Sequence, residues 1–403
     1  MDVTGWADGP GLMCAAPLAA AADGAMMAFA ALAEGADGAL PKGASLLGQR
    51  ARLRGLRRGG QQSPGGGCRL LPTRDGWIAL SVARNEDWAA VPAWLCDDLP
   101  AEWGAIGRAL REQGADGVVA RGRLLGLAVA RADGGDVAQA WRGRSSGTAG
   151  PVRRRRPVVI DLSALWAGPL AGALLRLAGA DVIKVEDVAR PDGARLGHGG
   201  FFDWLNGGKR CVALDFSDAQ GQAALRALLR QADIVIEGSR PRALRQIGVI
   251  AEEFLLRQPE LVWVSLTAHG RDGAAGAWVG FGDDAAVAGG LSLCMARTYG
   301  QMMFAGDAIA DPLTGLHAAV AAWAAWRRGV GGLVSLSLAG VVARAVQLGG
   351  MLTGDALAAR ADRWARAAGP WRTRLYPHPV AAGAARRYGA DTATVLSALG
   401  ARC

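Results

Sequence analysis

Short apolar runs alternate with amphipathic segments throughout the second half of the chain. The run PVVIDLS (157–163) is followed by a helical pattern, GPLAGALLRLAGA, and by a second apolar run, DVIKVE. The alternation continues through CVALDF, AQGQAALRALLRQA, DIVIE and EEFLLRQPELVWVSL. Strands that are apolar throughout and alternate with helices are typical of a parallel sheet covered by helices on both faces. We therefore expect an α/β fold over residues 158–403, with a ligand beyond the carboxyl ends of the strands.

The first third of the chain has a different pattern. MMAFAALAEG and ASLLGQRARLRGLRR have apolar positions three and four residues apart, which predicts helices. The stretch 63–88 contains two short apolar runs around Thr73-Arg74-Asp75-Gly76, which predicts a β-hairpin. Residues 132–157 are rich in Gly, Ser, Arg and Pro, and we interpret them as a linker. The sequence therefore predicts a smaller α+β unit within residues 1–131, joined by this linker to the large domain.

The composition is that of a folded globular protein, since 51% of the 403 residues are hydrophobic and 20% are charged. The net charge of +9 comes almost wholly from arginine, because the chain has only three lysines, Lys42, Lys184 and Lys209. Arginine favours paired hydrogen bonds to phosphate and carboxylate, so this charge could serve an anionic ligand. It could equally reflect a composition that is generally rich in arginine, without a functional role. The run RRRR (153–156) has no interleaved aromatic residues and no second basic segment, which favours a solvated linker over a nucleic-acid site.

Cysteine and histidine patterns suggest neither a metal site nor disulfides. The six cysteines form no CxxC pair, and the four histidines are far apart. Asp2 and Asp8 occupy the place where a signal peptide would be positively charged, and no apolar run reaches the roughly 20 residues of a membrane span. We expect a cytoplasmic protein with no metal, no permanently bound cofactor and no membrane or nucleic-acid partner.

A dinucleotide cofactor is a less favoured alternative. The loop after the first strand of the large domain, SALWAGPLAG, lacks the GxGxxG pattern, and Pro169 lies where a pyrophosphate would need backbone N–H groups. Glu186 does lie at a suitable distance for a ribose contact. Several arginines in the loops suit a phosphate-bearing ligand but are also typical of exposed loops: Arg190, Arg195, Arg240, Arg242 and Arg245.

Five stretches, in this order, carry a family resemblance: VVIDLSALWAGPLAGALLRLAGADVIKVEDVARPDGAR, NGGKRCVALDF, ADIVIEGSRPRALRQIG, LVWVSLTAHGRDG and IADPLTGLHAAVAA. Over about residues 158–338 they resemble the class III CoA-transferase (CaiB/BaiF) family, and the tail GADTATVLSALG resembles that family's C-terminal end. The resemblance implies a Rossmann-like large domain joined to a small domain, usually in interlocked homodimers. It also implies that acyl-CoA and carboxylic acids are the substrates, because the family moves CoA between carboxylic acids. Some relatives racemise or isomerise acyl-CoAs.

The stretch DPLTG places Asp311 at a predicted helix start. Aspartate at the N-cap, Pro312 at the first helical position and Thr314 at the third favour such a start, and the positive helix end would hold the carboxylate ionised. From these residues alone Asp311 is a cap. The resemblance implies that it is the catalytic nucleophile, which forms a mixed anhydride with the acyl group and then an aspartyl-CoA thioester. Backbone N–H groups would stabilise the oxyanions.

The order of the domains departs from the family. Matching Gly24 to Gly315 aligns the segment APLAAAADGAMMAFAALAEG with the predicted catalytic helix and puts Ala20 opposite Asp311, so the segment resembles a degenerate copy. The stretch after it resembles the family's small domain, which usually follows the catalytic helix. We infer a rearranged domain order, with Gly65, Gly66 and Gly67 either as a glycine-rich lid over Asp311 or as a plain flexible loop.

The resemblance also implies a set of CoA contacts: Leu165, Trp166, Arg190, Leu214, Gly238 and Arg245. Trp166 and Gln246 depart from the residues that the family has at these places.

Two other functions stay open beside CoA transfer. Racemases of the family use a histidine in the stretch equivalent to VGFGDDAAVAGG, which has none, and His269 lies in a different loop. Asp283 or Asp284 could supply a carboxylate base for a racemase or isomerase. A non-catalytic CoA-ester-binding protein is the other alternative, motivated by Ala20 and the rearranged order. The acyl donor and acceptor are not identified.

Overall fold

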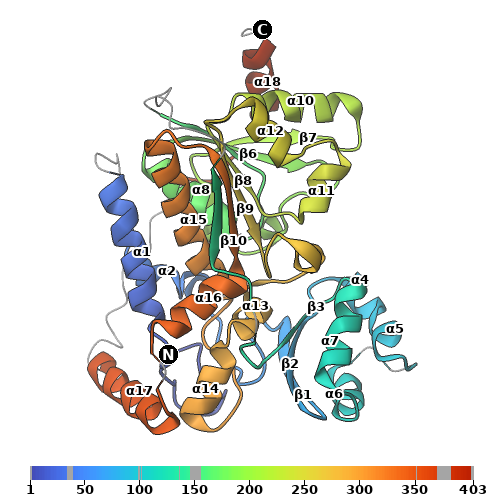
Figure 1. Cartoon of the computed structure of the whole chain (residues 1–403), viewed down its shortest axis with the longest axis vertical. Helices are drawn as coiled ribbons and strands as arrows, with labels where there is room; N and C mark the ends of the chain where they lie inside the picture. The colour runs from blue at the N-terminus through green and yellow to red at the C-terminus, as the bar shows by residue number, and fades with distance from the viewer. Residues whose placement is uncertain are drawn as a thin grey trace.

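The computed structural model describes residues 2–33, 40–98, 100, 102–135, 137–145, 156–350, 352–369 and 383–400. It has a large α/β unit and a smaller three-stranded unit, which lies at the lower right of Figure 1. None of the helices in these residues combines the length and apolar character needed to cross a membrane.

A seven-stranded sheet in the order β4-β10-β9-β8-β5-β6-β7 forms the centre of the large unit. Its strands are β4 (Trp141–Ser145), β5 (Val158–Asp161), β6 (Asp181–Asp187), β7 (Arg210–Leu214), β8 (Ile234–Glu237), β9 (Val262–Thr267) and β10 (Gly332–Ser337). Neighbouring strands are parallel except β4, which is antiparallel to β10. The predicted parallel sheet is therefore confirmed.

Strand β4 lies within the segment that we interpreted as a linker, so residues 132–157 are not a linker throughout. Its five residues are all exposed, and they pair with β10 in a register that places Trp141 opposite Leu336. Because all of its side chains are exposed, this edge strand has no apolar alternation for the sequence to reveal. Residues 153–155 of the arginine run lie outside the described part of the chain.

Helices cover both faces of the sheet (Figure 1). On one face α8 (Ala167–Leu177) packs against α15 (Ala310–Arg327), and α1 (Leu18–Leu32) packs on α15. On the other face are α10 (Ala219–Arg230), α12 (Ala251–Arg257) and α18 (Thr392–Gly400). Successive side chains of a strand point to opposite faces, so Val159 and Ile160 enter different cores, which is why the strands are apolar throughout.

Several shorter elements complete the large unit. They are η1 (Gly193–Leu196), α9 (Gly199–Asn206), α11 (Pro241–Gln246), η2 (Gly273–Ala277), α13 (Gly282–Ala288), α14 (Leu291–Tyr299), α16 (Leu338–Gln347) and α17 (Gly354–Ala368).

The small unit is an antiparallel sheet in the order β1-β2-β3, covered by short helices. Its elements are β1 (Cys68–Thr73), β2 (Gly76–Ser81), α4 (Asn85–Ala89), α5 (Val91–Leu95), α6 (Trp103–Arg111), α7 (Ala115–Leu124) and β3 (Ala128–Arg131). The predicted hairpin is confirmed, because β1 and β2 pair through a turn closed by Thr73 and Gly76. Its core includes the fully buried Trp94 and Ile106.

The N-terminal helices belong with the large unit rather than with the small sheet. The indole of Trp323 on α15 donates to the Leu32 carbonyl at 3.0 Å, and its ring lies 6.3 Å from that of Phe29. Helices α2 (Gly43–Leu46) and α3 (Gln49–Leu53) follow and contact α1 and α9, respectively. The helix that resembles a second copy of α15 thus lies beside α15, and Ala20 on it is exposed.

Candidate functional site

A cavity of about 630 Å³ lies between the large sheet and the small unit. The large unit contributes the loops after β5, β6, β8 and β9 and the starts of α13 and α15. The N-terminal part of the chain contributes α3, the glycine-rich loop before β1, and β2. Loops that follow parallel strands meet at one edge of a sheet, which is where ligands of such folds bind. The predicted location is therefore where the structure has its cavity.

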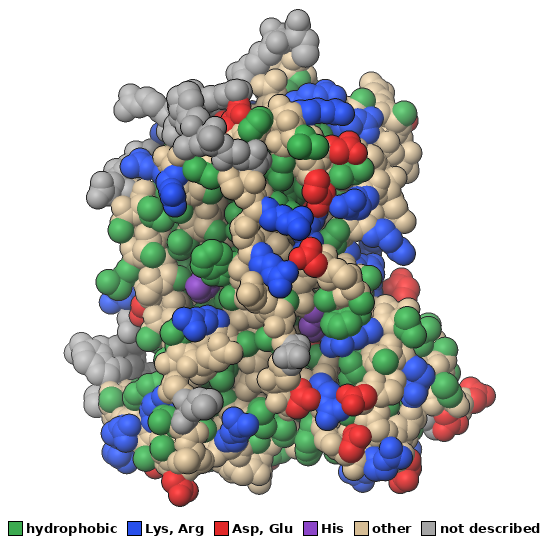
Figure 2. All heavy atoms as spheres, in the orientation of Figure 1, with side chains coloured by type: hydrophobic (Ala, Val, Ile, Leu, Met, Phe, Trp, Pro, Cys, Tyr) green, Lys and Arg blue, Asp and Glu red, His purple; other side chains and the backbone are tan. Residues whose placement is uncertain are grey.

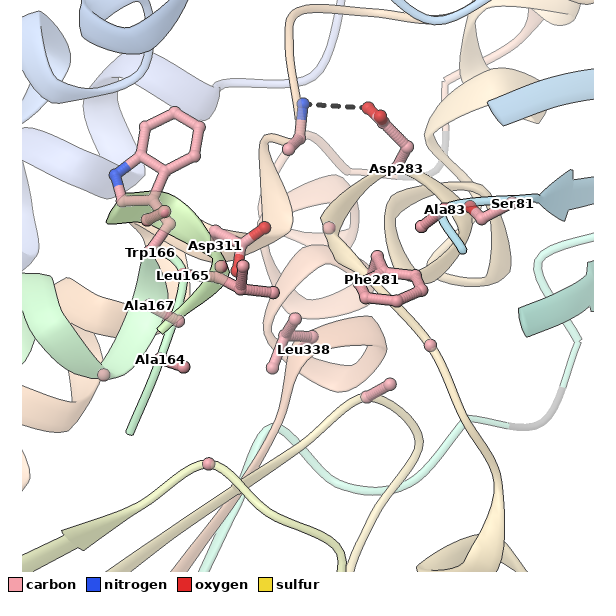
Figure 3. Close-up of a pocket in the computed structure, with 18 of the residues that line it drawn as sticks. Ser81, Ala83, Ala164, Leu165, Trp166, Ala167, Phe281, Asp283, Asp311 and Leu338 are labelled. Carbon is pink, nitrogen blue, oxygen red and sulfur yellow. Dashed lines mark hydrogen bonds between the residues drawn. The ribbon is translucent and has the colours of Figure 1, made fainter. Parts of the chain in front are cut away.

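Asp311 lies near the centre of this cavity, with Leu165, Trp166 and Ala167 on one side and Phe281 on the other (Figure 3). The backbone amide of Ala167, at the start of α8, lies close enough to the Asp311 carboxylate to lower its pKa. The carboxylate thus lies at the amino ends of two helices, α8 and its own α15, where partial positive charge gathers.

The predicted capping role of Asp311 is wrong. Helix α15 begins one residue earlier, at Ala310, so Ile309 is the N-cap and Asp311 is the second helical residue. Ile309 already has helical angles, with φ −55° and ψ −28°, and the Asp311 amide bonds the Ala308 carbonyl at 2.9 Å. Because the chain turns before Asp311, its side chain is free to face the cavity instead of closing the helix end.

The expected stabilisation of the ionised carboxylate by the helix end does not keep the pKa of Asp311 at its ordinary value. Burial raises the pKa of Asp311 to about 7, and the neighbouring carboxylates of Asp283 and Asp307 act in the same direction. The Arg50 guanidinium and the Ala167 amide lower this pKa, but they do not offset the cost of burial. Near neutral pH the carboxyl is therefore present in both protonation states.

Arg50 and Asp307 form an ion pair that the sequence did not reveal. The Arg50 Nε lies 2.8 Å from Asp307 Oδ2, its Nη2 contacts the other oxygen, and Asp307 is fully buried. The same guanidinium lies over the Trp166 ring, 5.2 Å from its centre. Because these partners are 257 positions apart in the chain, no local pattern points to them.

Four of the six CoA contacts implied by the resemblance line the cavity: Leu165, Trp166, Arg190 and Gly238. Leu165 has a left-handed backbone, with φ 69°, and its amide is held by Asp192 Oδ1 at 3.0 Å. Such a conformation is costly for leucine and is typical of functional sites.

Leu214 and Arg245 do not line the cavity. Leu214 ends β7, and its side chain is buried in the core on the α10 and α18 face of the sheet. Arg245 lies on α11 and pairs with Glu252 at 3.0 Å. The family pattern implied both as CoA contacts, but Leu214 packs into a core and Arg245 forms an ion pair outside the cavity.

The glycine-rich loop contacts the cavity through Gly65 and Gly67, whereas Gly66 does not line it. The nearest atom to a Cβ at Gly65 would be Arg50 Nη2, at 3.4 Å, and the next would be Asp307 Oδ1, at 3.8 Å. The loop therefore packs against the Arg50 and Asp307 pair at ordinary van der Waals distance.

Basic residues of both units line the cavity. Arg54 and Arg84 come from the N-terminal part, and Arg240 from the loop after β8. Burial lowers the pKa of Arg240, and Arg242, Arg84 and Arg190 lower it further because like charges gather there. On the face shown in Figure 2, in contrast, basic side chains are spread over both units rather than gathered in one strip.

His269 and Asp284 lie below the cavity wall and do not line it. The His269 Nε2 is 3.9 Å from Asp284 Oδ2, and neither atom has a hydrogen-bond partner. Burial lowers the pKa of His269 to about 4 and raises that of Asp284 to about 7.

Of the two aspartates that the sequence offered as a base for a racemase or isomerase, Asp283 lines the cavity. Within the described ranges, no group of three His, Cys, Asp or Glu side chains is arranged to hold a metal ion.

Comparison with known proteins gives one matching family model, that of CoA-transferase family III, over residues 157–373. The chain is similar to the succinate–glutarate CoA-transferase of Agrobacterium fabrum, at 33% identity over 41% of this chain and 45% of that protein. It is also similar to the succinyl-CoA–D-citramalate CoA-transferase of Chloroflexus aurantiacus, at 30% identity over 45% of this chain and 48% of that protein.

Two solved structures are also similar. The crystal structure of Rv3272 from Mycobacterium tuberculosis in its orthorhombic form has 29% identity, covers 50% of this chain and 57% of that chain, and gives a TM-score of 0.44. A CAIB/BAIF family protein from Brucella suis has 27% identity, covers 49% of this chain and 55% of that chain, and gives the same TM-score of 0.44. The chain therefore spans about half the length of these proteins.

Proposed function

The chain belongs to CoA-transferase family III, and from this premise we propose that it moves coenzyme A between an acyl-CoA and a carboxylic acid, with Asp311 as the nucleophile. The observation that carries the proposal is the position of Asp311, whose carboxylate faces a cavity of about 630 Å³ beside the Ala167 amide. A carboxylate is a nucleophile only when ionised, and a pKa of about 7 leaves a substantial ionised fraction at neutral pH.

The proposed reaction is balanced without a cofactor. An Asp311 oxygen attacks the thioester carbonyl, the carbon–sulfur bond breaks, and a mixed anhydride and the CoA thiolate result. The thiolate then attacks the aspartyl carbonyl, which releases the first carboxylate and leaves an aspartyl-CoA thioester. An incoming carboxylate reverses these two steps with a new acyl group and restores Asp311. Backbone amides of the cavity, including the glycine-rich loop, stabilise the oxyanions of the tetrahedral states.

We propose that the rim arginines hold the phosphates of CoA. Arg84 and Arg190 both lie near enough to Arg240 to act on it electrostatically, and arginine binds phosphate through paired, charge-assisted hydrogen bonds. Leu165, Trp166 and Gly238 then line the path of the pantetheine arm toward Asp311. Leu214 and Arg245 have no part in this proposal, since both lie away from the cavity.

The rearranged domain order, a homodimer and a cytoplasmic location stay predictions from the sequence. The position of α1 beside α15 supports the first of these, because a degenerate copy of the catalytic helix would be expected to pack where a family helix packs. In this arrangement the glycine-rich segment Gly65, Gly66 and Gly67 closes over the cavity from the N-terminal side.

An acyl-CoA racemase or isomerase is the second candidate, because Asp283 lines the cavity and could remove an α-proton. Such an enzyme would carry solvent deuterium into the α-carbon of an acyl-CoA without any acceptor acid. Transfer would not.

The test of the first proposal is covalent trapping. The protein is incubated with butyryl-CoA and then with hydroxylamine, and Asp311 is examined by peptide mass spectrometry for conversion to the hydroxamate. We expect this product in the natural protein and its loss in Asp311→Ala, with CoA affinity largely retained. Acyl exchange that survives in Asp311→Ala would refute the nucleophile, whereas tight CoA binding without an adduct would support a non-catalytic binder.

A further inference from the structure

Asp283 and Asp311 line the cavity, whereas Asp307 is fully buried and does not. All three carboxylates act electrostatically on the guanidinium of Arg50, which also lines the cavity. Arg50 directs its Nε and Nη2 to Asp307, so its hydrogen-bonding fork is already occupied. The charge of Arg50 is therefore matched first by the buried Asp307, and the acidic groups that face the cavity are Asp283 and Asp311.

Asp283 lines the cavity and has no part in the proposed transfer reaction. Its Oδ1 accepts a hydrogen bond from the Ala308 amide at 2.8 Å, drawn as the dashed line in Figure 3, and the neighbouring Ser63 hydroxyl lowers the pKa of the same carboxylate. Both groups are neutral. The side chain is only partly covered and lines the cavity, so a bound acyl group can approach it.

The acidic and the basic residues of the cavity wall come from different elements. Asp283 and Asp311, at the starts of α13 and α15, form what we call the acidic end. Arg84, Arg190 and Arg240 lie in the loops after β2, β6 and β8. A CoA thioester whose phosphates lie at the arginines and whose carbonyl carbon reaches Asp311 therefore directs its acyl chain toward the acidic end.

An acyl group with a second carboxylate is poorly suited to this end of the cavity. It would place another negative charge near Asp283 and Asp311, and like charges that are partly shielded from bulk water repel one another. The charge of Arg50 offsets that of Asp307, which is fully buried and is held by two of its nitrogens, so this arginine is poorly placed to neutralise a further carboxylate. A neutral acyl chain meets instead the ring of Phe281 and the Ser81 hydroxyl, which also line the cavity.

We propose that Asp283 selects against acyl groups that carry a second carboxylate, so that the site takes CoA thioesters of monocarboxylic acids; this inference rests on the proposed function. Selection by an unfavourable charge is a common route to specificity. The similar enzymes of Agrobacterium fabrum and Chloroflexus aurantiacus are named for succinate, glutarate and citramalate, which are dicarboxylic acids. The proposal therefore gives this chain a different class of acyl substrate.

The test compares two ligands that differ only in charge. These are the ketone analogues of succinyl-CoA and of its neutral amide, succinamyl-CoA, in which a methylene group replaces the thioester sulfur so that neither can acylate the protein. Dissociation constants are measured by calorimetry for the natural protein, for Asp283→Asn and for Asp272→Asn. The last is the matched control, because Asp272 is an exposed aspartate that pairs with Arg142 and does not line the cavity.

We expect the natural protein and Asp272→Asn to bind the amide at least about tenfold more tightly than the acid, and Asp283→Asn to reduce this ratio to within about threefold. Equal or tighter binding of the acid by the natural protein would overturn the proposal, as would an unchanged ratio in Asp283→Asn. The comparison within the natural protein needs no variant, so it decides the question even if Asp283→Asn fails to fold.

Trapping of the Asp311 adduct separates this inference from the proposed function. If binding selects the amide but butyryl-CoA gives no adduct, the transferase proposal fails and the selectivity of the site stands. If succinyl-CoA and succinamyl-CoA both acylate Asp311 at the same rate, the transferase proposal stands and the role of Asp283 is wrong.

Discussion

The carboxylate of Asp311 occupies the space that a side chain at Gly282 would fill. A Cβ at Gly282 would overlap Asp311 Oδ2, and it would also approach the Cβ and the carbonyl oxygen of Ala308 to 2.8 Å. Helix α13 can therefore begin directly against the candidate nucleophile only because its first residue is glycine.

Gly282→Ala should displace the Asp311 carboxylate. We expect the rate of adduct formation with butyryl-CoA to fall at least about tenfold, since small misplacements of reacting groups cost rate steeply. The free energy of unfolding should fall by about 1–3 kcal/mol, as in other overpacked sites. Gly24→Ala is the control, because no atom lies within 4 Å of a Cβ placed there in α1. This control should keep its rate and gain about 0.5–1 kcal/mol. A natural rate in Gly282→Ala would contradict the argument.

The pH dependence of acylation follows from the raised pKa of Asp311. Only the ionised carboxylate is nucleophilic, so the rate should rise with pH and reach half its maximum near the pKa of about 7. Removing the negative charge of Asp283, which contributes to this raised pKa, should move the midpoint to lower pH. Single-turnover rates of the natural protein and Asp283→Asn between pH 5 and about pH 9 check both statements. A midpoint near the ordinary aspartate value in the natural protein would show that burial does not control this group.

Arg50→Met should destabilise the fold, because it leaves the fully buried Asp307 without its ionic partner. The expected loss is about 3 kcal/mol in the free energy of unfolding, measured by urea denaturation. Adding Asp307→Asn removes the unpaired charge and should restore at least half of that loss. If the double variant were no more stable than Arg50→Met, contacts of the Arg50 side chain with Trp166, rather than its charge, would explain the loss.

Arg240→Ala should weaken CoA binding, and Arg245→Ala should not. Arg240 lines the cavity within the group of rim arginines, whereas Arg245 pairs with Glu252 outside it. A hydrogen bond to a charged phosphate contributes roughly 1.5–3 kcal/mol, so the dissociation constant of CoA should rise at least about tenfold in Arg240→Ala. Calorimetry with both variants makes the comparison. An equal rise of the dissociation constant in both variants would show that Arg245 contacts CoA as well.

Much of the fold could be predicted because its signals are local. The apolar runs at residues 158–161 and 181–187 are strands, and the amphipathic stretch between them is a helix, as the periodicity indicates. The edge strand β4 was missed for the opposite reason. Its side chains are all exposed, so only its pairing with β10, which is distant in sequence, makes it a strand.

The candidate site could be predicted only in part. Asp311, Leu165 and Gly238 line the cavity as the family pattern implied, because each lies at a helix start or strand end whose position the local sequence specifies. Leu214 and Arg245 occupy comparable positions, yet one packs into a core and the other pairs with Glu252. A side chain's direction depends on neighbours that sequence spacing does not reveal.

The sequence by itself determined the order of strands and helices, the family and the residue that we propose as nucleophile, because periodicity and short motifs are properties of neighbouring positions. Only the tertiary structure decided the chemistry around Asp311. It brings Arg50 from α3, Asp283 from α13 and the Ala167 amide from α8 to one carboxylate. Burial and the distance between charges determine a pKa, and both arise only when these separate segments pack together.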